Sequence, residues 1–409
     1  MPEPTLVHQV ELSAPPVDVA TDHAAARVLV RLHGMPLGFL DLPVADGVLT
    51  ASAIHVAAAD QLDVAGHLVG DGLTDVHAPL PEGGFVCRAG GPYPAPPGVS
   101  VVLCTRDRED LLRTALTSVI AALGPADEVV VVDNAPGTSA TRSVVADLAD
   151  PRVRYVLEAR QGLLSVARNS GARAARGALI AFTDDDVVVD ADWVAGLTRG
   201  FTRAARVGCV TGLVPSAELD TAAQHFFDRK VQWSSSCVPR LFDLDGHRGA
   251  GVLYPYSAGI FGTGANFAVS RAAFEALGGF DEVLGAGALT RGGEDLDWFV
   301  RTLHHGFALA YEPGAIVWHR HRRDLDDLRD QLYGYGTGLT AYLFKHALTR
   351  RGAVDLSRRL ARGAVLMGRA RKASAEAGID RALLRRELVG MVHGPVLYAR
   401  ARRAVRRAR

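Results

Sequence analysis

Three consecutive aspartates, Asp184, Asp185 and Asp186, directly follow the apolar run ALIAF. Adjacent carboxylates repel one another, so the cluster needs solvent, a shared proton or a cation to offset its charge. Mg²⁺ and Mn²⁺ prefer carboxylate oxygens together with substrate phosphates. In extended backbone alternate side chains point the same way, so residues 184 and 186 can hold one ion together. A solvated acidic turn or a helix N-cap remains an alternative interpretation.

Two other segments carry side chains suited to a nucleotide. Asp133 ends the apolar run EVVVVD, where its carboxylate can accept a hydrogen bond from a base or a ribose hydroxyl. The alternative for Asp133 is an Asx turn that starts the next loop. Arg168 lies in segment 162–171, and its guanidinium can form a bidentate contact with a diphosphate. The alternative for Arg168 is the solvent face of an amphipathic helix.

A carboxylate pair and a histidine follow later in the chain. Glu294 and Asp295 come after Gly292-Gly293 and start a helical pattern. Asp295 can cap that helix, or act as a general base towards an acceptor hydroxyl. An unperturbed aspartate has a pKa of about 3.9, so it is already ionised at neutral pH. His319, in VWHRHR, can complete a metal site or have a structural role.

The segment GTGANF, residues 262–267, resembles a dinucleotide fingerprint only in part. Phe267 stands where that motif has its third glycine, and no good βαβ unit follows. We therefore exclude a Rossmann cofactor site.

Short apolar runs alternate with helical patterns from residue 99 onwards. The helical pattern of EDLLRTALTSVIAAL has Leu112, Leu116 and Ile120 at fourfold spacing. The runs that predict strands are VSVVLC, EVVVVD, RVRYVL and ALIAF, and a further ordered segment begins with ANFAVS. Continuous β-branched runs separated by helices predict an α/β fold with a mainly parallel sheet covered on both faces. Ligands of such sheets bind beyond the carboxyl ends of the strands, where the polar residues above are expected.

The chain divides by pattern into three parts. The pattern of residues 1–97 predicts an accessory module. It contains a hairpin that turns at His33-Gly34, then a helix, and it ends in a proline-rich linker, PYPAPPG. Residues 98–323 form the α/β domain, in which 218–264 is irregular. Residues 324–409 predict a helical, arginine-rich extension.

Composition narrows the class of protein. The 409 residues are 48% apolar and 22% charged, as in folded globular proteins, and the four cysteines exclude a disulfide-built module. We find no apolar stretch near 18 residues and no secretory leader, so the expected compartment is the cytoplasm.

The formal net charge of zero conceals an asymmetry. Residues 350–409 carry 17 Arg and Lys against 4 Asp and Glu, an excess of 13 that the rest of the chain balances. A basic amphipathic helix can bind the anionic inner face of a membrane as a peripheral attachment. The other interpretation is that the basic tail packs on the acidic body. Nucleic-acid binding is not expected, because Tyr398 is the only aromatic residue of the tail and no recognition module occurs.

Taken together, the ordered motifs resemble a family 2 glycosyltransferase with the GT-A fold. The resemblance covers roughly residues 99–320 and assigns the glycosyltransferase domain to 98–323. It rests on VSVVLCTRDR, VVVVDNAPGT, GLLSVARNSGARAARGALIAFTDDDV, GTGANFAVSRAAFEALGGFDE and GGEDLDWFVR. The resemblance implies a hexosyltransferase-like enzyme that moves a sugar, with inversion, from a nucleoside diphosphate donor to a hydroxyl acceptor. The implied cofactor is Mn²⁺ or Mg²⁺, and the acceptor is a glycan, a lipid-linked molecule or a small molecule.

The same resemblance implies residues for the donor. Thr105 and Arg106 fall in the segment that lines the nucleotide pocket, and Asp133 falls where the family holds the base or ribose. Arg168 falls where the family contacts the diphosphate region, and Asp184 also lies on the donor side.

For the metal, the resemblance implies Asp186 as the best single ligand, with Asp184 and with His319, which matches a histidine that helps bind metal in some members. Asp295 falls at the position of the general base, with Glu294 as its neighbour. The loop 285–293 is expected to order over the bound donor and exclude water.

Three departures from the family pattern qualify this assignment. TRDR replaces the commoner Thr-Tyr-Asn-Arg type of start, and the aspartate run leaves the metal register open between Asp184 and Asp185. The processive QxxRW signature is absent, since Gln331 is followed by LYGYG, which favours addition of one or a few sugars. A sugar nucleotidyltransferase is one alternative, although TRDRED is a poor triphosphate loop. A sugar-nucleotide-binding protein without catalysis is another.

Overall fold

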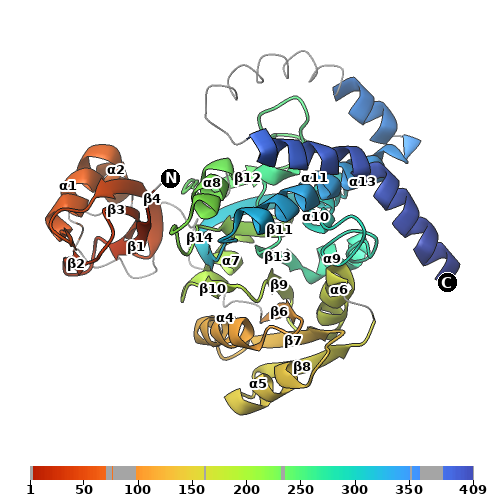
Figure 1. The fold of residues 1–409 in the computed structure, drawn as a ribbon, viewed down its shortest axis with the longest axis horizontal. Coiled ribbons are helices and arrows are strands. Elements are labelled where there is room, and N and C mark those ends of the chain that lie inside the picture. Colours follow the sequence, from red (N-terminus) through yellow and green to blue (C-terminus); the bar gives the residue numbers. More distant parts are fainter. Residues whose placement is uncertain are drawn as a thin grey trace.

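The computed structural model describes residues 3–70, 76, 98–160, 163–231, 235–350, 352–359 and 381–408. Its central feature is a nine-stranded, mainly parallel sheet with helices on both faces, as predicted (Figure 1). The sheet strands are β6 Val99–Thr105, β7 Glu128–Asn134, β8 Val153–Glu158, β9 Leu179–Thr183, β10 Val187–Val189, β11 Val207–Leu213, β12 Arg240–Phe242, β13 Asn266–Ser270 and β14 Ala308–His319.

The strand order is β10-β14-β11-β13-β9-β6-β7-β8, and β12 pairs with β14. Strands β9, β6, β7 and β8 are parallel to one another, whereas β13 is antiparallel to both β9 and β11. The carboxyl ends of β6, β7 and β9 therefore meet at one edge of the sheet.

Alternation of apolar side chains divides the core between the two faces of the sheet. In β7, Val130 and Val132 pack into one buried cluster, while Val129 and Val131 pack into the other. The covering helices are α4 Glu109–Ala122, α5 Ala140–Leu148, α6 Leu164–Ala174, α7 Trp193–Gly200, α8 Ala222–Lys230, α9 Arg271–Leu277 and α10 Glu294–His304, with a short 3₁₀ turn, η1 Ala258–Ile260. The fourfold spacing that predicted α4 places Leu112 and Leu116 in the core.

An N-terminal body lies to one side of the sheet (Figure 1). The predicted hairpin is present as β3 and β4, with positive φ at His33 and Gly34, whereas the single helix expected in 51–68 is divided between α1 and α2. Arg31 joins this body to the sheet domain through a buried ion pair with Asp190, at 2.6 Å. Its elements are β1 Thr5–Glu11, β2 Val19–Ala20, β3 Ala25–Leu32, β4 Met35–Pro43, β5 Val48–Leu49, α1 Ala51–Gln61 and α2 Val64–Gly70.

Two long helices, α11 Leu325–Ala347 and α13 Arg381–Ala408, form most of the described C-terminal region, and residues 352–359 between them are also helical. They pack along each other through glycines. A Cβ added at Gly336 would lie 2.1 Å from the carbonyl oxygen of Glu387, and one added at Gly390 would lie 2.3 Å from that of Tyr333. This close approach requires glycine on both helices.

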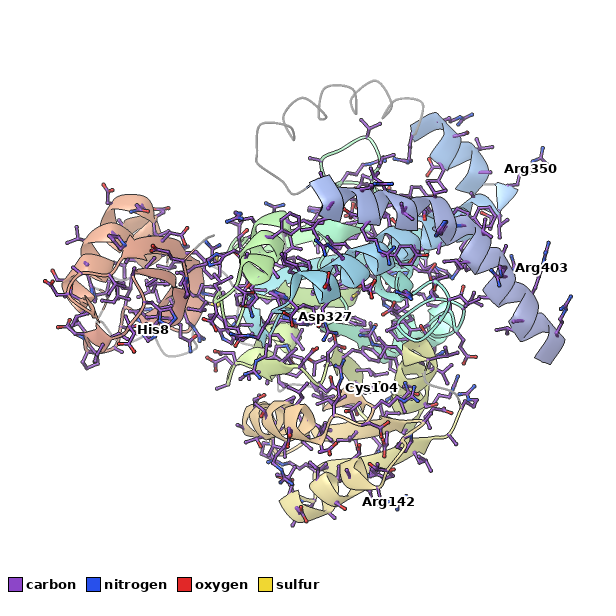
Figure 2. All side chains as sticks on the ribbon, viewed as in Figure 1. His8, Cys104, Arg142, Asp327, Arg350 and Arg403 are labelled. Atoms are coloured by element: carbon purple, nitrogen blue, oxygen red, sulfur yellow. The ribbon has the colours of Figure 1, made fainter. Side chains whose placement is uncertain are left out.

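One face of α13 therefore packs on α11 and on the sheet domain, whereas the interpretation that the basic tail is held by the acidic charge of the body stays a prediction. The contacts include a Lys230–Glu387 ion pair at 2.6 Å and a hydrogen bond from the Tyr398 hydroxyl to Asp281 at 3.1 Å. The C-terminal end of α13 extends beyond the body and carries Arg403 (Figures 1 and 2).

The predicted division at 97/98 and 323/324 stays a prediction. Most of the PYPAPPG linker and residues 360–380 of the tail lie outside the described residues. No described helix is both long and apolar enough to cross a bilayer.

Candidate active site

A cavity of about 710 Å³ opens at the carboxyl edge of the sheet. Strand β6, the segment that follows β9, helices α6, α10 and α11 and the loop before α10 contribute to its wall. Of the residues that the sequence singled out, the cavity is lined by Thr105, Arg106, Arg168, Asp184, Asp185, Asp186, Glu294, Asp295 and His319. The fold thus brings residues separated by more than 200 positions to one site.

Asp184, Asp186 and His319 form a group that can hold a metal ion. One ligand atom from each side chain lies within 4.8 Å of the others. The register explains the grouping, because β10 pairs with β14 so that Val187 faces His319, directly after Asp186. His319 Nε2 lies 3.4 Å from Asp186, while its Nδ1 is buried without a hydrogen-bond partner among the described residues.

The electrostatics of this group favour a cation. Burial, reinforced by the charge of Asp186, raises the pKa of Asp184 to about 6 despite the opposing charge of Arg168. A divalent ion would offset the repulsion between the two carboxylates. The two carboxylates are ligands that Mn²⁺ and Mg²⁺ prefer, and His319 adds one nitrogen ligand. The residues present therefore fit the implied metal.

Asp185 is oriented differently from its two neighbours. Its carboxylate accepts a hydrogen bond from the Thr105 hydroxyl at 2.7 Å and another from Arg108 at 3.1 Å. It is buried, and burial raises its pKa. Asp185 therefore supports the end of β6 while Asp184 and Asp186 face His319. A strand, β10, follows the aspartates, so none of them starts a helix.

Arg168 connects the metal group with the carboxylates of α10. Its side chain is only 2% exposed, which excludes the solvent-face interpretation. It donates hydrogen bonds to Asp184 at 3.1 Å, to Glu294 at 2.9 Å and to the Gly264 carbonyl at 2.9 Å. The guanidinium fixes the separation between the two carboxylates and supplies positive charge to the cavity floor.

Helix α10 begins at Glu294, immediately after Gly293, whose φ of 90° is a left-handed conformation that favours glycine. Two backbone N–H groups orient the Asp295 carboxylate: Gly264 donates to Oδ2 and Leu296 to Oδ1, each at 2.8 Å. Asp295 is thus held rigidly at the cavity wall. Burial and the neighbouring Asp295 charge raise the pKa of Glu294 to about 7, although Arg168 opposes the shift.

We expect Glu294→Gln to change how stability depends on pH. The folded-state pKa of Glu294, about 7, lies above its ordinary value of 4.5, so its ionisation destabilises the fold progressively from about pH 4.5 to 7. At about 1.36 kcal/mol per pKa unit, the contribution approaches roughly 3 kcal/mol above pH 7. Urea unfolding at pH 4.5 and 8 should show a smaller alkaline loss of stability in Glu294→Gln than in the parent. The exposed control Glu109→Gln should follow the parent, and equal losses in all three proteins would contradict the shift.

Two residues that were predicted to contact the nucleotide donor, Asp133 and Arg106, are poorly placed for that contact. Asp133 is fully buried, accepts a hydrogen bond from Tyr155 at 2.7 Å and is absent from the described cavity wall, where Asn134 stands instead. Arg106 reaches the wall with a side chain that is 54% exposed. The predicted start of segment 162–171, Gly162, lies outside the described residues.

The sequence interpretation missed some of the cavity wall. Arg108 pairs with Asp185 and lies 3.5 Å from Asp186, and it stands within the TRDR run that was already noted. Gln331 and Tyr335 of α11 also line the cavity, as does Arg291 within the loop 285–293 that was expected to cover the donor. No local pattern marks Gln331 or Tyr335 as cavity residues, because α11 reaches the site only through the tertiary fold.

Residues 100–278 match the family model described as Glycosyl transferase family 2. This chain carries a family 2 glycosyltransferase domain. The predicted family is confirmed for this segment, and the strand order confirms the predicted α/β architecture with a mainly parallel sheet. The matched segment includes Asp133, Arg168 and the three aspartates, whereas Asp295 and His319 lie beyond it.

Named relatives agree with the family. The chain is 28% identical over 182 residues to the pre-mycofactocin glycosyltransferase of Mycobacterium tuberculosis, covering 44% of this chain and 35% of that protein. It is 29% identical over 227 residues to the validoxylamine A glucosyltransferase of Streptomyces hygroscopicus subsp. limoneus, covering 52% and 49%. The chain therefore spans less than half the length of these relatives.

Among solved structures, a mannosyltransferase from Pyrobaculum calidifontis in complex with GDP-Man and Mn²⁺ matches with a TM-score of 0.48 and 17% identity. The match covers 75% of this chain and 86% of that one.

Proposed function

We propose that this protein is a metal-dependent, inverting glycosyltransferase that moves a sugar from a nucleoside diphosphate donor to a hydroxyl acceptor. The observation that carries the proposal is the meeting of a cation-binding group, Asp184, Asp186 and His319, with a fixed carboxylate, Asp295, in one cavity. Diphosphate departure and proton removal from an acceptor need these two kinds of group.

The metal, held by Asp184, Asp186 and His319, would supply Lewis-acid neutralisation of the donor diphosphate. Arg168 adds positive charge to the same region and keeps Asp184 in position. Asp295 accepts the proton of the acceptor hydroxyl while the acceptor oxygen bonds to the anomeric carbon. The bond from that carbon to the diphosphate breaks on the opposite side, so the anomeric configuration inverts.

The loop 285–293 belongs to the same proposal, as a cover that excludes water from the donor. Both of its sides are tied to helices. Ser165 of α6 donates to the Leu284 carbonyl at 2.7 Å, and Thr337 of α11 donates to the Thr290 carbonyl at 2.6 Å. The donor is therefore proposed to order only the central residues of this loop.

Because no QxxRW signature follows Gln331, we propose that the enzyme adds one or a few sugars to its acceptor.

A thermal-shift panel tests the donor and metal together. Nucleoside diphosphates and sugar nucleotides are compared with and without Mn²⁺ or Mg²⁺, using the full chain. One nucleotide should stabilise the protein in a metal-dependent manner, by about 2.7 kcal/mol at a hundredfold excess over its dissociation constant. Metal-independent binding of a nucleoside triphosphate would instead favour a nucleotidyltransferase, and no shift with any nucleotide would refute the proposal.

We further propose peripheral attachment to anionic membranes through the outer face of α13. This face exposes Leu388, Val392 and Val396, which are 55%, 74% and 60% exposed. Arg400 and Arg403 continue it towards the C-terminus and are also exposed. An apolar stripe with arginines can insert into the lipid interface, and each arginine near the surface adds about 1 kcal/mol.

Vesicle co-sedimentation checks this attachment. Val392→Asp should lower binding to vesicles that contain phosphatidylglycerol by about tenfold, because a buried apolar side chain of this size contributes roughly 1.5 kcal/mol or more. Val56→Asp, at a similarly exposed valine of α1, should bind as the parent does. Equal binding by both variants and the parent would refute the role of α13.

A further inference from the structure

A second hollow, of about 590 Å³, lies beside the catalytic cavity. Its wall comes from the loop before α10, from α11 and from α13. The lining is largely apolar: Ala286, Gly287, Ala288, Leu289, Arg291, Tyr333 and Leu397. Leu289 is 48% exposed although it belongs to an otherwise anchored loop, so a large apolar side chain faces unfilled space.

The hollow and the cavity adjoin each other. Ala286, Gly287 and Arg291 line both of them, so the two spaces meet at this part of the loop. This junction lies on the side of Asp295, since the chain runs from Arg291 through Gly292-Gly293 directly into α10. None of Asp184, Asp186 and His319 lines the hollow, which separates it from the proposed diphosphate position.

Arg291 marks the boundary between the polar and the apolar parts. Its guanidinium lies 5.2 Å from the centre of the Tyr333 ring, and Arg386 approaches the same ring at 4.9 Å. Among the described residues, Arg291 forms no ion pair. The Tyr333 hydroxyl bonds to His393 of α13, which fixes the ring as a wall of the hollow.

We propose that this hollow binds the apolar part of the acceptor, so that the acceptor is an amphiphile: a hydroxyl-bearing head joined to an alkyl or aromatic group. The inference rests on the proposed function, because it places the head beside Asp295. A purely polar acceptor would leave Leu289, Tyr333 and Leu397 facing water. An apolar group there removes this surface from water, and the shared wall at residues 286, 287 and 291 directs the attached hydroxyl into the cavity.

Calorimetric titration of the full chain with n-alkyl β-D-glucosides, kept below their micellar concentrations, tests the site. Affinity should rise at least tenfold from butyl to octyl glucoside, since each methylene that enters an apolar site favours binding by up to about fourfold. Leu289→Asp should remove most of this gain, and Leu289→Ala should remove part of it. Val392→Asp, on the outer face of the adjoining helix α13, should retain it.

The outcomes separate this inference from the proposed function. A further variant, Leu397→Asp, alters the hollow from α13, outside the loop 285–293, and should lose the same chain-length gain. Nucleotide and Mn²⁺ binding, measured on the same samples, should be unchanged in Leu397→Asp. Equal affinity for butyl and octyl glucoside would overturn the hollow as an acceptor site even where nucleotide binding persists. Loss of the chain-length gain in Val392→Asp, with its retention in Leu289→Asp, would also overturn it, because the probe would then bind the outer stripe of α13.

Discussion

Replacing Asp295 with asparagine is expected to lower the rate of sugar transfer by about 10²- to 10⁴-fold, the usual contribution of a general base. Folding should be largely preserved. Asparagine can still accept one of the two backbone hydrogen bonds that Asp295 receives from Gly264 and Leu296, so the expected loss is about 1 kcal/mol. Steady-state turnover, with nucleotide binding measured in parallel, checks this expectation.

A second carboxylate distinguishes chemistry from helix capping. Asp326 occupies the first turn of α11, as Asp295 does of α10, but its side chain is 89% exposed. Asp326→Asn should therefore leave turnover unchanged while it removes a similar interaction with the helix dipole. If Asp295→Asn turned over at nearly the parent rate, Asp295 would be excluded as the base, and Glu294 would be the next candidate.

The parallel half of the sheet follows from local sequence alone. Runs such as EVVVVD are apolar at every position because both faces of the strand are covered, and the two alternating sets of valines enter separate clusters. The position of the three aspartates after ALIAF can also be predicted from the sequence, because the preceding strand determines where the chain leaves the sheet. These features depend on neighbours in sequence.

Strand β11 shows what local patterns miss. Val207–Leu213 contains two glycines, which weaken a strand pattern. Tertiary packing requires both. A Cβ on Gly208 would lie 2.6 Å from the side chain of Phe307, and one on Gly212 would lie 2.1 Å from the Ala315 carbonyl. The glycines allow the neighbouring chain to approach, and that chain is about 100 residues away.

Strand β14 and the stretch 218–264, which is irregular by sequence, both depend on packing partners elsewhere in the chain. Residues 308–319 form one strand, although Glu312, Pro313 and Gly314 interrupt its apolar pattern. Glu312 is fully buried because Arg199 and Arg203 of the α7 region pair with it. The stretch 218–264 contains α8, β12 and η1, whose packing partners lie elsewhere in the chain.

Long-range pairing also limited the site prediction. Arg168 donates a hydrogen bond to Glu294, 126 positions away. The Asp133 carboxylate accepts a hydrogen bond from the Tyr155 hydroxyl of the adjacent strand. Residue type suggested a ligand contact for both. Their hydrogen-bond partners, which decide how free each side chain is, could not be identified without the fold.

Removal of the divalent metal is expected to lower turnover by about 10³-fold or more. Metal stabilisation of the departing diphosphate is worth several kcal/mol, and each 1.36 kcal/mol is tenfold in rate. Chelation by EDTA should produce this loss, and added Mn²⁺ should reverse it. Asp186→Asn should reproduce the loss without rescue, because an amide is a weaker ligand than a carboxylate within the Asp184, Asp186 and His319 group.

The metal prediction can be separated from general damage to the site. Asp192→Asn removes an aspartate that is 64% exposed and lies outside the described cavity wall, so it should keep both turnover and the response to Mn²⁺. In Asp186→Asn the Mn²⁺-dependent gain in nucleotide binding should disappear, while metal-free binding stays near that of the parent. Full turnover of the parent in EDTA would contradict metal dependence. Charge neutralisation at the diphosphate would then have to come from the arginines of the cavity, of which Arg168 is already engaged by two carboxylates.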